Sequence, residues 1–470
     1  MFETCSPETM NVDSAGIVRF LDEMKEKHLH MHVMMILRRG KVIFETSFAP
    51  WSKDKKHMLF SLSKSFTSTA VGFAVQDGLL KTADRLVDFF PELLTNKPCE
   101  NMQKITVKNL LTMNTGHKAE PARMGNEWEK DFVRSYIEFE PGTHFMYNTY
   151  GTFMLSAIVQ KVTGKKLVEY LKEKLFIPLG MSEDIWSEES PSGVATGGYG
   201  LNVRIADIAK LGQFYLQGGV WEGKQLLNAE WIRDAQTPWS DNSISGSDGD
   251  WGQGYGYQFW MCKPEGVFRG DGAFGQYCIV CPKQEMVIAI NSGVSDMGAV
   301  MRSIWNNILP GVDHAGENDQ AALTERARHT VTPACWEDNA EDASAPAPEK
   351  GWIGRYRMNK DNPLQLELFE LDEANAYLTL QGVRNAVPLC LDTWQHVKLE
   401  PDGDNDKNYM NEAAVRAARV GDQLVLHFCH TKTPFEDVLR ISFSEHGLHM
   451  DGRRNVGFGE GKYELLGYRL

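Results

Sequence analysis

Residues 60–68 read FSLSKSFTS and contain a Ser-x-x-Lys pair, Ser61 and Lys64. If this segment opens a helix, residues three positions apart lie on the same face, which brings the Lys64 amine within reach of the Ser61 hydroxyl. A serine hydroxyl is a weak nucleophile until an adjacent base removes its proton. A partly desolvated, neutral lysine can be that base. The pair therefore predicts a nucleophile, Ser61, and its base, Lys64.

The residues that follow predict the helix. Phe66, Ala70, Phe73 and Ala74 recur at helical spacing, and Gly78 is a plausible stop. The Ser-x-x-Lys pair alone is weak evidence, because both residue types are common and serine is favoured as a helix cap. A plain capping role is the alternative for this segment if no further motif supports a nucleophile.

Six segments of the chain together support the interpretation of Ser61 as a nucleophile. From about residue 15 to about residue 310 the chain resembles the serine β-lactamase-related family, which groups class C β-lactamases, penicillin-binding proteins, D-amino-peptidases and several esterases. The six segments follow the family's order: SLSKSFT at 61–67, ITVKNLLTMNTG at 105–116, PGTHFMYNT at 141–149, VTG at 162–164, PLGM at 178–181, and GGYG at 197–200 followed by Asp207. The resemblance implies an α+β fold of the β-lactamase/transpeptidase type, with an antiparallel sheet flanked by helices and an all-helical lobe.

The resemblance also implies a catalytic tyrosine. In the family a tyrosine follows a Pro-Gly pair by about five residues and begins a Tyr-x-Asn motif; here the matching residues are Tyr147, Asn148 and Thr149. Tyr147 is expected to take part in proton transfer. The asparagine stands one place early and a threonine takes its usual position, so either Asn148 or Thr149 is a candidate substrate contact. The alternative for Tyr147 is a packed aromatic residue before a helix.

The third family motif is altered. Relatives carry Lys-Thr-Gly or His-x-Gly on the strand facing the serine, whereas this chain reads RGDGAFGQ at 269–276, and Gly270 to Gly272 is the best placement. Glycines would leave a clear edge for substrate, and a backbone N–H near Ala273 would join that of Ser61 in an oxyanion hole. Arg269 and Asp271 should share a strand face, where they could pair. An acidic residue in this motif favours neutral esters or amides over penicillins or cephalosporins.

Composition narrows the possible partners and location. The chain has 470 residues, 42% hydrophobic and 24% charged, and a formal net charge of -14. That charge argues against nucleic acid or an anionic membrane as a partner. The first residues lack the pattern of a secretory signal, and no apolar run is long enough to span a membrane, so we expect a cytoplasmic protein whose oligomeric state is unknown.

Cysteine and histidine patterns predict neither metal nor cofactor. The eight cysteines are scattered, which favours reduced thiols. Cys278 and Cys281 have metal-site spacing, but they fall in an apolar run typical of a buried strand, where positions three apart face opposite sides. His427 and His430 around Cys429 are interpreted in the same way, as structural or surface residues.

The chain divides into three predicted parts. Residues 1–312 form the catalytic domain, and 313–350, rich in Ala, Pro, Asp and Glu, form a linker. Residues 351–470 alternate apolar and polar positions between turn residues, which predicts an antiparallel β domain, possibly barrel-like. No motif with chemistry of its own occurs there, so we expect this domain to be dispensable for acylation by a small probe.

Together these features predict a serine hydrolase that works through an acyl-enzyme on a small ester, amide or peptide-like substrate. Ser61 attacks the carbonyl, Lys64 accepts its proton, Tyr147 relays a proton to the leaving group, and water releases the acyl group. We expect the pKa of Lys64 or Tyr147 to be lowered by burial and nearby charge. A Ser-His-Asp mechanism is disfavoured because no Gly-x-Ser-x-Gly elbow occurs. The alternative is a catalytically silent relative that binds a peptide or acyl ligand.

Overall fold

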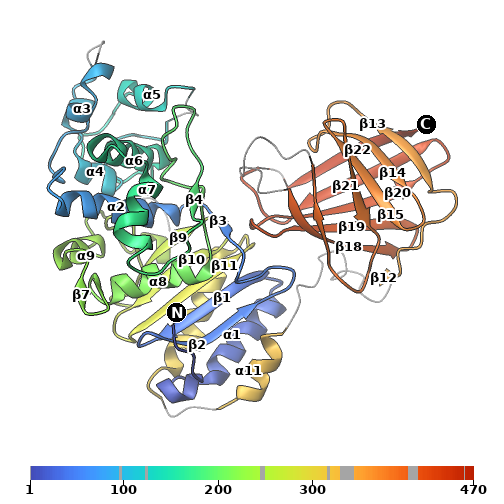
Figure 1. Cartoon of the computed structure of the whole chain (residues 1–470), viewed down its shortest axis with the longest axis horizontal. Helices are drawn as coiled ribbons and strands as arrows, with labels where there is room; N and C mark the ends of the chain where they lie inside the picture. The colour runs from blue at the N-terminus through green and yellow to red at the C-terminus, as the bar shows by residue number, and fades with distance from the viewer. Residues whose placement is uncertain are drawn as a thin grey trace.

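The computed structural model describes residues 2–94, 98–121, 125–243, 249–314, 318–328, 343–400, 411–459 and 461–470. The first part of the chain is built on a six-stranded antiparallel sheet in the order β2-β1-β11-β10-β9-β8 (Figure 1). Its strands are β1 Met31–Arg38, β2 Lys41–Ser47, β8 Trp260–Met261, β9 Phe268–Gly272, β10 Gln276–Cys281 and β11 Met286–Ser292. Four of them, β1, β9, β10 and β11, are buried along their whole length, because helices cover the sheet.

The helices on this sheet follow the amphipathic patterns of the sequence. Helix α8, Ile205–Leu216, packs on β10, β11 and β1. Helix α1, Ser14–Glu26, buries Ile17, Phe20 and Leu21, as its apolar spacing predicts. Helix α10, Met297–Ser303, continues as a π-helical segment, Ile304–Ile308, that packs on α1.

A lobe of helices stands over one end of the main sheet (Figure 1). Its members are α2 Ser63–Gln76, α3 Leu86–Phe89, α4 Val107–Leu111, α5 Trp128–Arg134, α6 Thr149–Thr163, α7 Leu167–Leu171 and α9 Ala229–Ala235. Helix α4 begins after Thr106, which forms a capping box with Asn109. A small sheet of β3 His57–Leu59, β5 Leu201–Val203 and β4 Trp186–Ser187 joins the lobe to the main sheet, and a hairpin, β6 Val220–Trp221 and β7 Lys224–Gln225, precedes α9.

The C-terminal part is a single eleven-stranded antiparallel sheet. Its strands are β12 Ala343–Ser344, β13 Gly354–Met358, β14 Leu366–Leu371, β15 Asn375–Leu380, β16 Val383–Pro388, β17 Gln395–Lys398, β18 Glu412–Val420, β19 Gln423–His430, β20 Glu436–Phe443, β21 Gly447–Arg454 and β22 Lys462–Arg469. The sheet curls into a half-barrel, which brings β16 beside β17 (Figure 1). The predicted alternation is seen directly, because Leu424, Leu426 and Phe428 point into an apolar core that is separate from that of the main sheet.

The predicted linker is partly helical. Residues 315–317 and 329–342 lie outside the described residues. Between them, helix α11, Gln320–Arg326, packs on α1, buries Leu323, and pairs Arg326 with Asp22 at 2.5 Å. The chain therefore stays packed on the first part well beyond residue 313.

Two further observations bear on the setting of the protein. Among the described helices, none combines the length and the apolar character that a membrane crossing needs. The described cysteines are free thiols, and Cys278 and Cys281 lie buried in β10, as predicted for a core strand.

Candidate active site

Ser61 and Lys64 meet at the start of α2. Lys64 Nζ lies 3.1 Å from Ser61 Oγ, the contact that their spacing predicts. The stretch before Ser61 is held by Gln276 on β10, whose Oε1 accepts the Phe60 N–H at 2.7 Å and whose Nε2 donates to the Met58 carbonyl at 2.7 Å. The nucleophile candidate is thus fixed by its own helix on one side and by the main sheet on the other.

The surroundings of Lys64 suit a base. Its side chain is 1% exposed, and its ammonium donates to the Gly198 carbonyl at 2.9 Å and to Thr149 Oγ1 at 3.4 Å. Burial lowers the pKa of Lys64 to about 7, although the carboxylates of Glu120 and Asp271 oppose this effect. A substantial fraction of Lys64 is therefore neutral near pH 7 and can accept a proton.

Tyr147 lies against the same lysine. Lys64 Nζ is 4.9 Å from the centroid of the Tyr147 ring, and the other side of the ring stacks on Trp260 at 5.3 Å. Burial and the charge of Asp271 raise the pKa of Tyr147, and its hydrogen bond with Ser61 offsets only part of the rise. The expectation of a lowered tyrosine pKa is therefore wrong, because burial disfavours the anion of a phenol but the cation of a lysine. Tyr147 is a neutral phenol at physiological pH.

The structure separates the roles of Asn148 and Thr149. Asn148 is fully buried, and its Oδ1 accepts the Gly151 N–H at 3.0 Å as the N-cap of α6. Thr149 is the residue that turns its hydroxyl to Lys64. Asn148 is therefore not brought to the Ser61–Lys64 pair, since the cap geometry directs its side chain along the helix backbone.

The altered third motif lies on β9, directly against α2. A Cβ on Gly270 would be 2.5 Å from both Leu62 Cδ1 and Ser65 Oγ, and one on Gly272 would be 3.2 Å from the Ser61 nitrogen. These glycines let the strand approach the nucleophile helix, a packing requirement in addition to the expected open edge. Ala273 follows Gly272 at the β9–β10 turn, so its N–H and that of Ser61 are the candidate oxyanion donors.

The opposite face of β9 carries the expected ion pair. Arg269 Nε donates to Asp271 Oδ2 at 2.9 Å, and both side chains are buried. Trp251 Nε1 donates to the same carboxylate oxygen at 3.1 Å. Burial raises the pKa of Asp271 despite these partners. Arg269 is thus engaged within the protein and does not present a free cation to a ligand.

Sequence reasoning missed a carboxylate beside the site. Glu120 Oε1 accepts the Thr149 N–H at 2.6 Å, and the charge of Glu120 raises the pKa of Lys64. The only available signal was the charged segment between residues 117 and 140, which lacks a motif at Glu120. Its position depends on a loop that returns to the start of α6.

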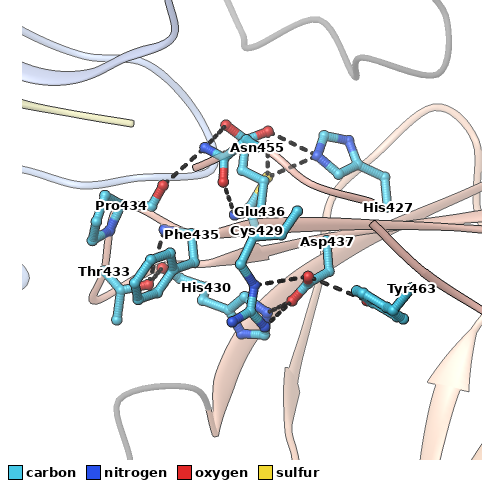
Figure 2. A network of polar contacts seen from close by, with 11 residues as sticks. His427, Cys429, His430, Thr433, Pro434, Phe435, Glu436, Asp437, Asn455 and Tyr463 are labelled. Carbon is cyan, nitrogen blue, oxygen red and sulfur yellow. Dashed lines mark hydrogen bonds and ion pairs between the residues drawn. The ribbon is translucent and has the colours of Figure 1, made fainter. Parts of the chain in front are cut away.

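The residues best suited to a metal lie in the C-terminal sheet. His427, Cys429 and Glu436 form a buried group whose ligand atoms lie within 4.8 Å of one another, and His449, Asp451 and Glu464 form a more exposed one. In the buried group His427 Nε2 contacts Glu436 Oε2 at 2.8 Å (Figure 2). His30 Nδ1 contacts the other carboxylate oxygen at 2.8 Å.

Those contacts favour a structural role for the buried group. Burial opposes ionisation of Glu436, but the pairing with His30 and His427 outweighs it and lowers the pKa of Glu436. Among the described residues none forms a hydrogen bond with the buried His427 Nδ1, whereas a metal-bound histidine normally donates from its second nitrogen. The group therefore fits a carboxylate held between two histidines better than a metal centre.

The comparisons with known proteins agree with this geometry. The described elements make up a β-lactamase/transpeptidase fold that continues into a curled half-barrel sheet. Residues 19–308 match the sequence model of the Beta-lactamase family, and the chain belongs to this family. The resemblance to serine β-lactamase-related proteins is thereby confirmed.

Individual relatives are distant. The chain is 26% identical over 303 residues to 6-aminohexanoate-dimer hydrolase from Paenarthrobacter ureafaciens, a match that covers 59% of this chain and 76% of that protein. It is 23% identical over 331 residues to penicillin-binding protein 4 from Amycolatopsis lactamdurans, covering 61% and 82%. The octameric penicillin-binding protein homologue from Pyrococcus abyssi superimposes with a TM-score of 0.51 at 18% identity, over 95% of this chain and 98% of that one.

Proposed function

We propose that this protein is a serine hydrolase that turns over neutral esters or amides through an acyl-enzyme on Ser61. The observation that carries the proposal is the 3.1 Å contact between Ser61 Oγ and Lys64 Nζ, made by a buried lysine whose pKa is about 7. Such a lysine can take the serine proton without help from a metal or a histidine. The relative from Paenarthrobacter ureafaciens is named as a hydrolase, which supports the reaction class.

The reaction follows from the positions of three side chains. Neutral Lys64 accepts the Ser61 proton while Oγ attacks the carbonyl carbon, and the backbone N–H groups of Ser61 and Ala273 stabilise the resulting oxyanion. Tyr147, a phenol in contact with both Ser61 and Lys64, donates its proton to the leaving group and takes the proton held by Lys64 in its place, so that Lys64 returns to its neutral form. Water then attacks the acyl-enzyme, and the same groups return the proton to Ser61.

The ion pair on β9 supports neutral substrates. A penicillin or cephalosporin carries a carboxylate that needs a cation, and Arg269 already donates to Asp271. Because Asp271 and Arg269 neutralise each other, a substrate carboxylate at this position would lose its hydration without gaining a cation as a partner. Esters and amides without a carboxylate at that position avoid this cost.

A fluorophosphonate probe followed by intact-mass measurement tests the proposal. We expect one adduct on the native protein, located on Ser61, and none on Ser61→Ala. Ser68→Ala, further along the same helix, is the matched control and should be labelled like the native protein. The rival function, ligand binding without catalysis, would be supported if the native protein is folded but forms no adduct with this probe or with p-nitrophenyl acetate.

A further inference from the structure

Two loops of the C-terminal sheet reach β3, which leads to Ser61, and the end of β11. Between β19 and β20, the Lys432 carbonyl accepts the N–H of Met58 in β3 at 2.8 Å. Between β21 and β22, Asn455 Nδ2 donates to the Gly293 carbonyl at 3.1 Å, directly after β11. With the contact between His30 and Glu436, these bonds dock the C-terminal sheet beside the active site.

Four phenylalanine rings meet at this junction, and we refer to them as the four-ring cluster. Phe60 and Phe274 come from the catalytic part, and their centroids are 5.3 Å apart. Phe435 and Phe458 come from the two docked loops: Phe435 lies 6.1 Å from Phe60 and 5.8 Å from Phe274, and Phe458 lies 5.5 Å and 5.0 Å from the same two rings. These separations and the mostly edge-on angles are typical of favourable aromatic pairs.

The cluster borders the candidate oxyanion hole. Phe60 directly precedes Ser61, and Phe274 directly follows Ala273, so the two residues adjoin the two proposed N–H donors along the backbone. Phe274 has a φ of 70°, a left-handed conformation that is unusual for a bulky residue. Strain of this kind is retained where the surrounding structure requires a given side-chain direction.

The cluster is open to solvent on one side. Phe274 is 8% exposed, whereas Phe458 is 80% exposed although it contacts two other rings. An exposed large aromatic ring that continues an apolar surface offers contact area to an apolar ligand. Covering it would remove apolar surface from water at the mouth of the site.

Hydrogen bonds hold Phe435 in position before any ligand arrives. Thr433 Oγ1 accepts the Phe435 N–H at 3.1 Å, and the Phe435 carbonyl accepts the His430 N–H at 3.0 Å (Figure 2). Asn455 Nδ2 also donates to the Pro434 carbonyl at 2.9 Å, and the Arg454 guanidinium lies 5.2 Å from the Phe435 ring. The loop is therefore preorganised, which reduces the entropy cost of binding.

We propose that the four-ring cluster binds the acyl portion of the substrate and that this portion is an apolar alkyl or aryl group. This inference rests on the proposed function of Ser61. The catalytic part supplies the nucleophile and half of the acyl-binding wall, and the C-terminal sheet supplies the other half. A small acyl group such as acetyl is too short to use this wall, so the proposal is compatible with the prediction that the β domain is dispensable for acylation by a small probe.

Esters with one leaving group and different acyl chains test the inference. For p-nitrophenyl 4-phenylbutyrate and p-nitrophenyl hexanoate, we expect Phe458→Ala to lower kcat/KM about tenfold, the effect of losing one well-packed aromatic contact. For p-nitrophenyl acetate the change should stay below about twofold. Phe458→Leu should restore much of the rate on the hexanoate. Because Phe458 is mostly exposed, its removal leaves the fold intact.

A control variant distinguishes the effect of the four-ring cluster from the effect of losing any exposed aromatic ring. Tyr468→Ala removes another exposed aromatic of the same sheet, at 63% exposure, and should change no rate. The inference is overturned if Phe458→Ala slows acetate and 4-phenylbutyrate equally, if it slows neither, or if Tyr468→Ala has the same effect. It is also overturned if, in a series of acetate esters of different alcohols, the fall in kcat/KM caused by Phe458→Ala depends on the alcohol, since the cluster would then bind the leaving group.

A binding measurement keeps this inference separate from the proposed function. On the Ser61→Ala background, calorimetry with the product acid 4-phenylbutyrate needs no turnover. We expect binding that weakens about tenfold when Phe458→Ala is added, and no comparable binding of acetate. If the native protein hydrolyses none of these esters while the Ser61→Ala variant shows Phe458-dependent binding, the catalytic role is rejected and the acyl-binding role is kept. Binding that is absent or independent of Phe458 would reject the acyl-binding role of the cluster.

Discussion

Arg269 and Asp271 form a buried ion pair on one face of β9, while the glycines between and beside them face the nucleophile helix. The 2.9 Å contact neutralises the acidic residue at the position where relatives carry their third motif. It also removes the arginine as a partner for a substrate carboxylate.

This pair predicts substrate preference. On one preparation, kcat/KM should be higher for p-nitrophenyl acetate or butyrate than for a chromogenic cephalosporin, because the cephalosporin carboxylate would meet Asp271 without a free cation. A short D-amino-acid amide tests whether amides are accepted as well. Faster turnover of the cephalosporin would show that Arg269 leaves Asp271 when substrate binds.

The same pair predicts a stability effect. Arg269→Met leaves a buried carboxylate unpaired and should lower the free energy of unfolding by about 3–5 kcal/mol, measured by urea denaturation. The exposed pair Lys283–Glu265 is the control, and Lys283→Met should change stability by less than about 1 kcal/mol. If Arg269→Met costs no more than the control, the buried pair does not hold β9 in place.

The pKa of Lys64 predicts the acid limb of the activity profile. Below a pKa of about 7 the lysine is protonated and cannot accept the serine proton, so kcat/KM for a neutral ester should rise through pH 7. Tyr147, whose pKa is raised by burial, stays protonated and adds no limb between pH 5 and 9. A flat profile across that range, with chemistry rate-limiting, would count against Lys64 as the base.

Replacing Glu120 should shift the acid limb of the pH profile of kcat/KM. Its carboxylate stabilises the Lys64 ammonium, so Glu120→Gln should lower the pKa of Lys64 and move the acid limb to lower pH. Glu138→Gln, which removes an exposed carboxylate paired with Lys118, is the matched control and should leave the limb unchanged. The pH dependence of kcat/KM for both variants decides whether Glu120 acts on the base.

Thr149 and Asn148 should give opposite kinds of effect. Thr149→Ala removes a hydroxyl that contacts Lys64 and should lower kcat, with recovery in Thr149→Ser. Asn148→Ala removes a helix cap and should cost about 1 kcal/mol of stability. Thermal unfolding and steady-state kinetics on both variants test the assignment, which is reversed if Asn148→Ala lowers kcat without lowering stability.

Local contacts explain what could be predicted from the sequence. Lys64 reaches Ser61 because residues three apart on a helix are neighbours, whatever the rest of the fold does. The β1–β2 hairpin and helix α1 follow from short-range periodicity in the same way. The strands of the C-terminal sheet were also predictable, since their alternation marks the buried face.

The remaining features depend on contacts between distant parts of the chain. Whether Asn148 or Thr149 faces Lys64 is decided by the cap of α6, and the approach of Glu120 is decided by a loop that no periodic pattern describes. The opposite shifts in the pKa of Lys64 and Tyr147 required knowledge of their burial.

The junction at Phe60 is the feature that the sequence alone could least predict. From the sequence alone, Ser61 and Lys64 could be identified as a reactive pair, because the helix that joins them is local. Phe435 and Phe458 lie more than 370 positions away from Phe60, in a part of the chain with no catalytic motif. Only the docking of the C-terminal sheet on β3 and β11 brings these rings beside the nucleophile, since packing between separately formed surfaces leaves no short-range pattern in the sequence.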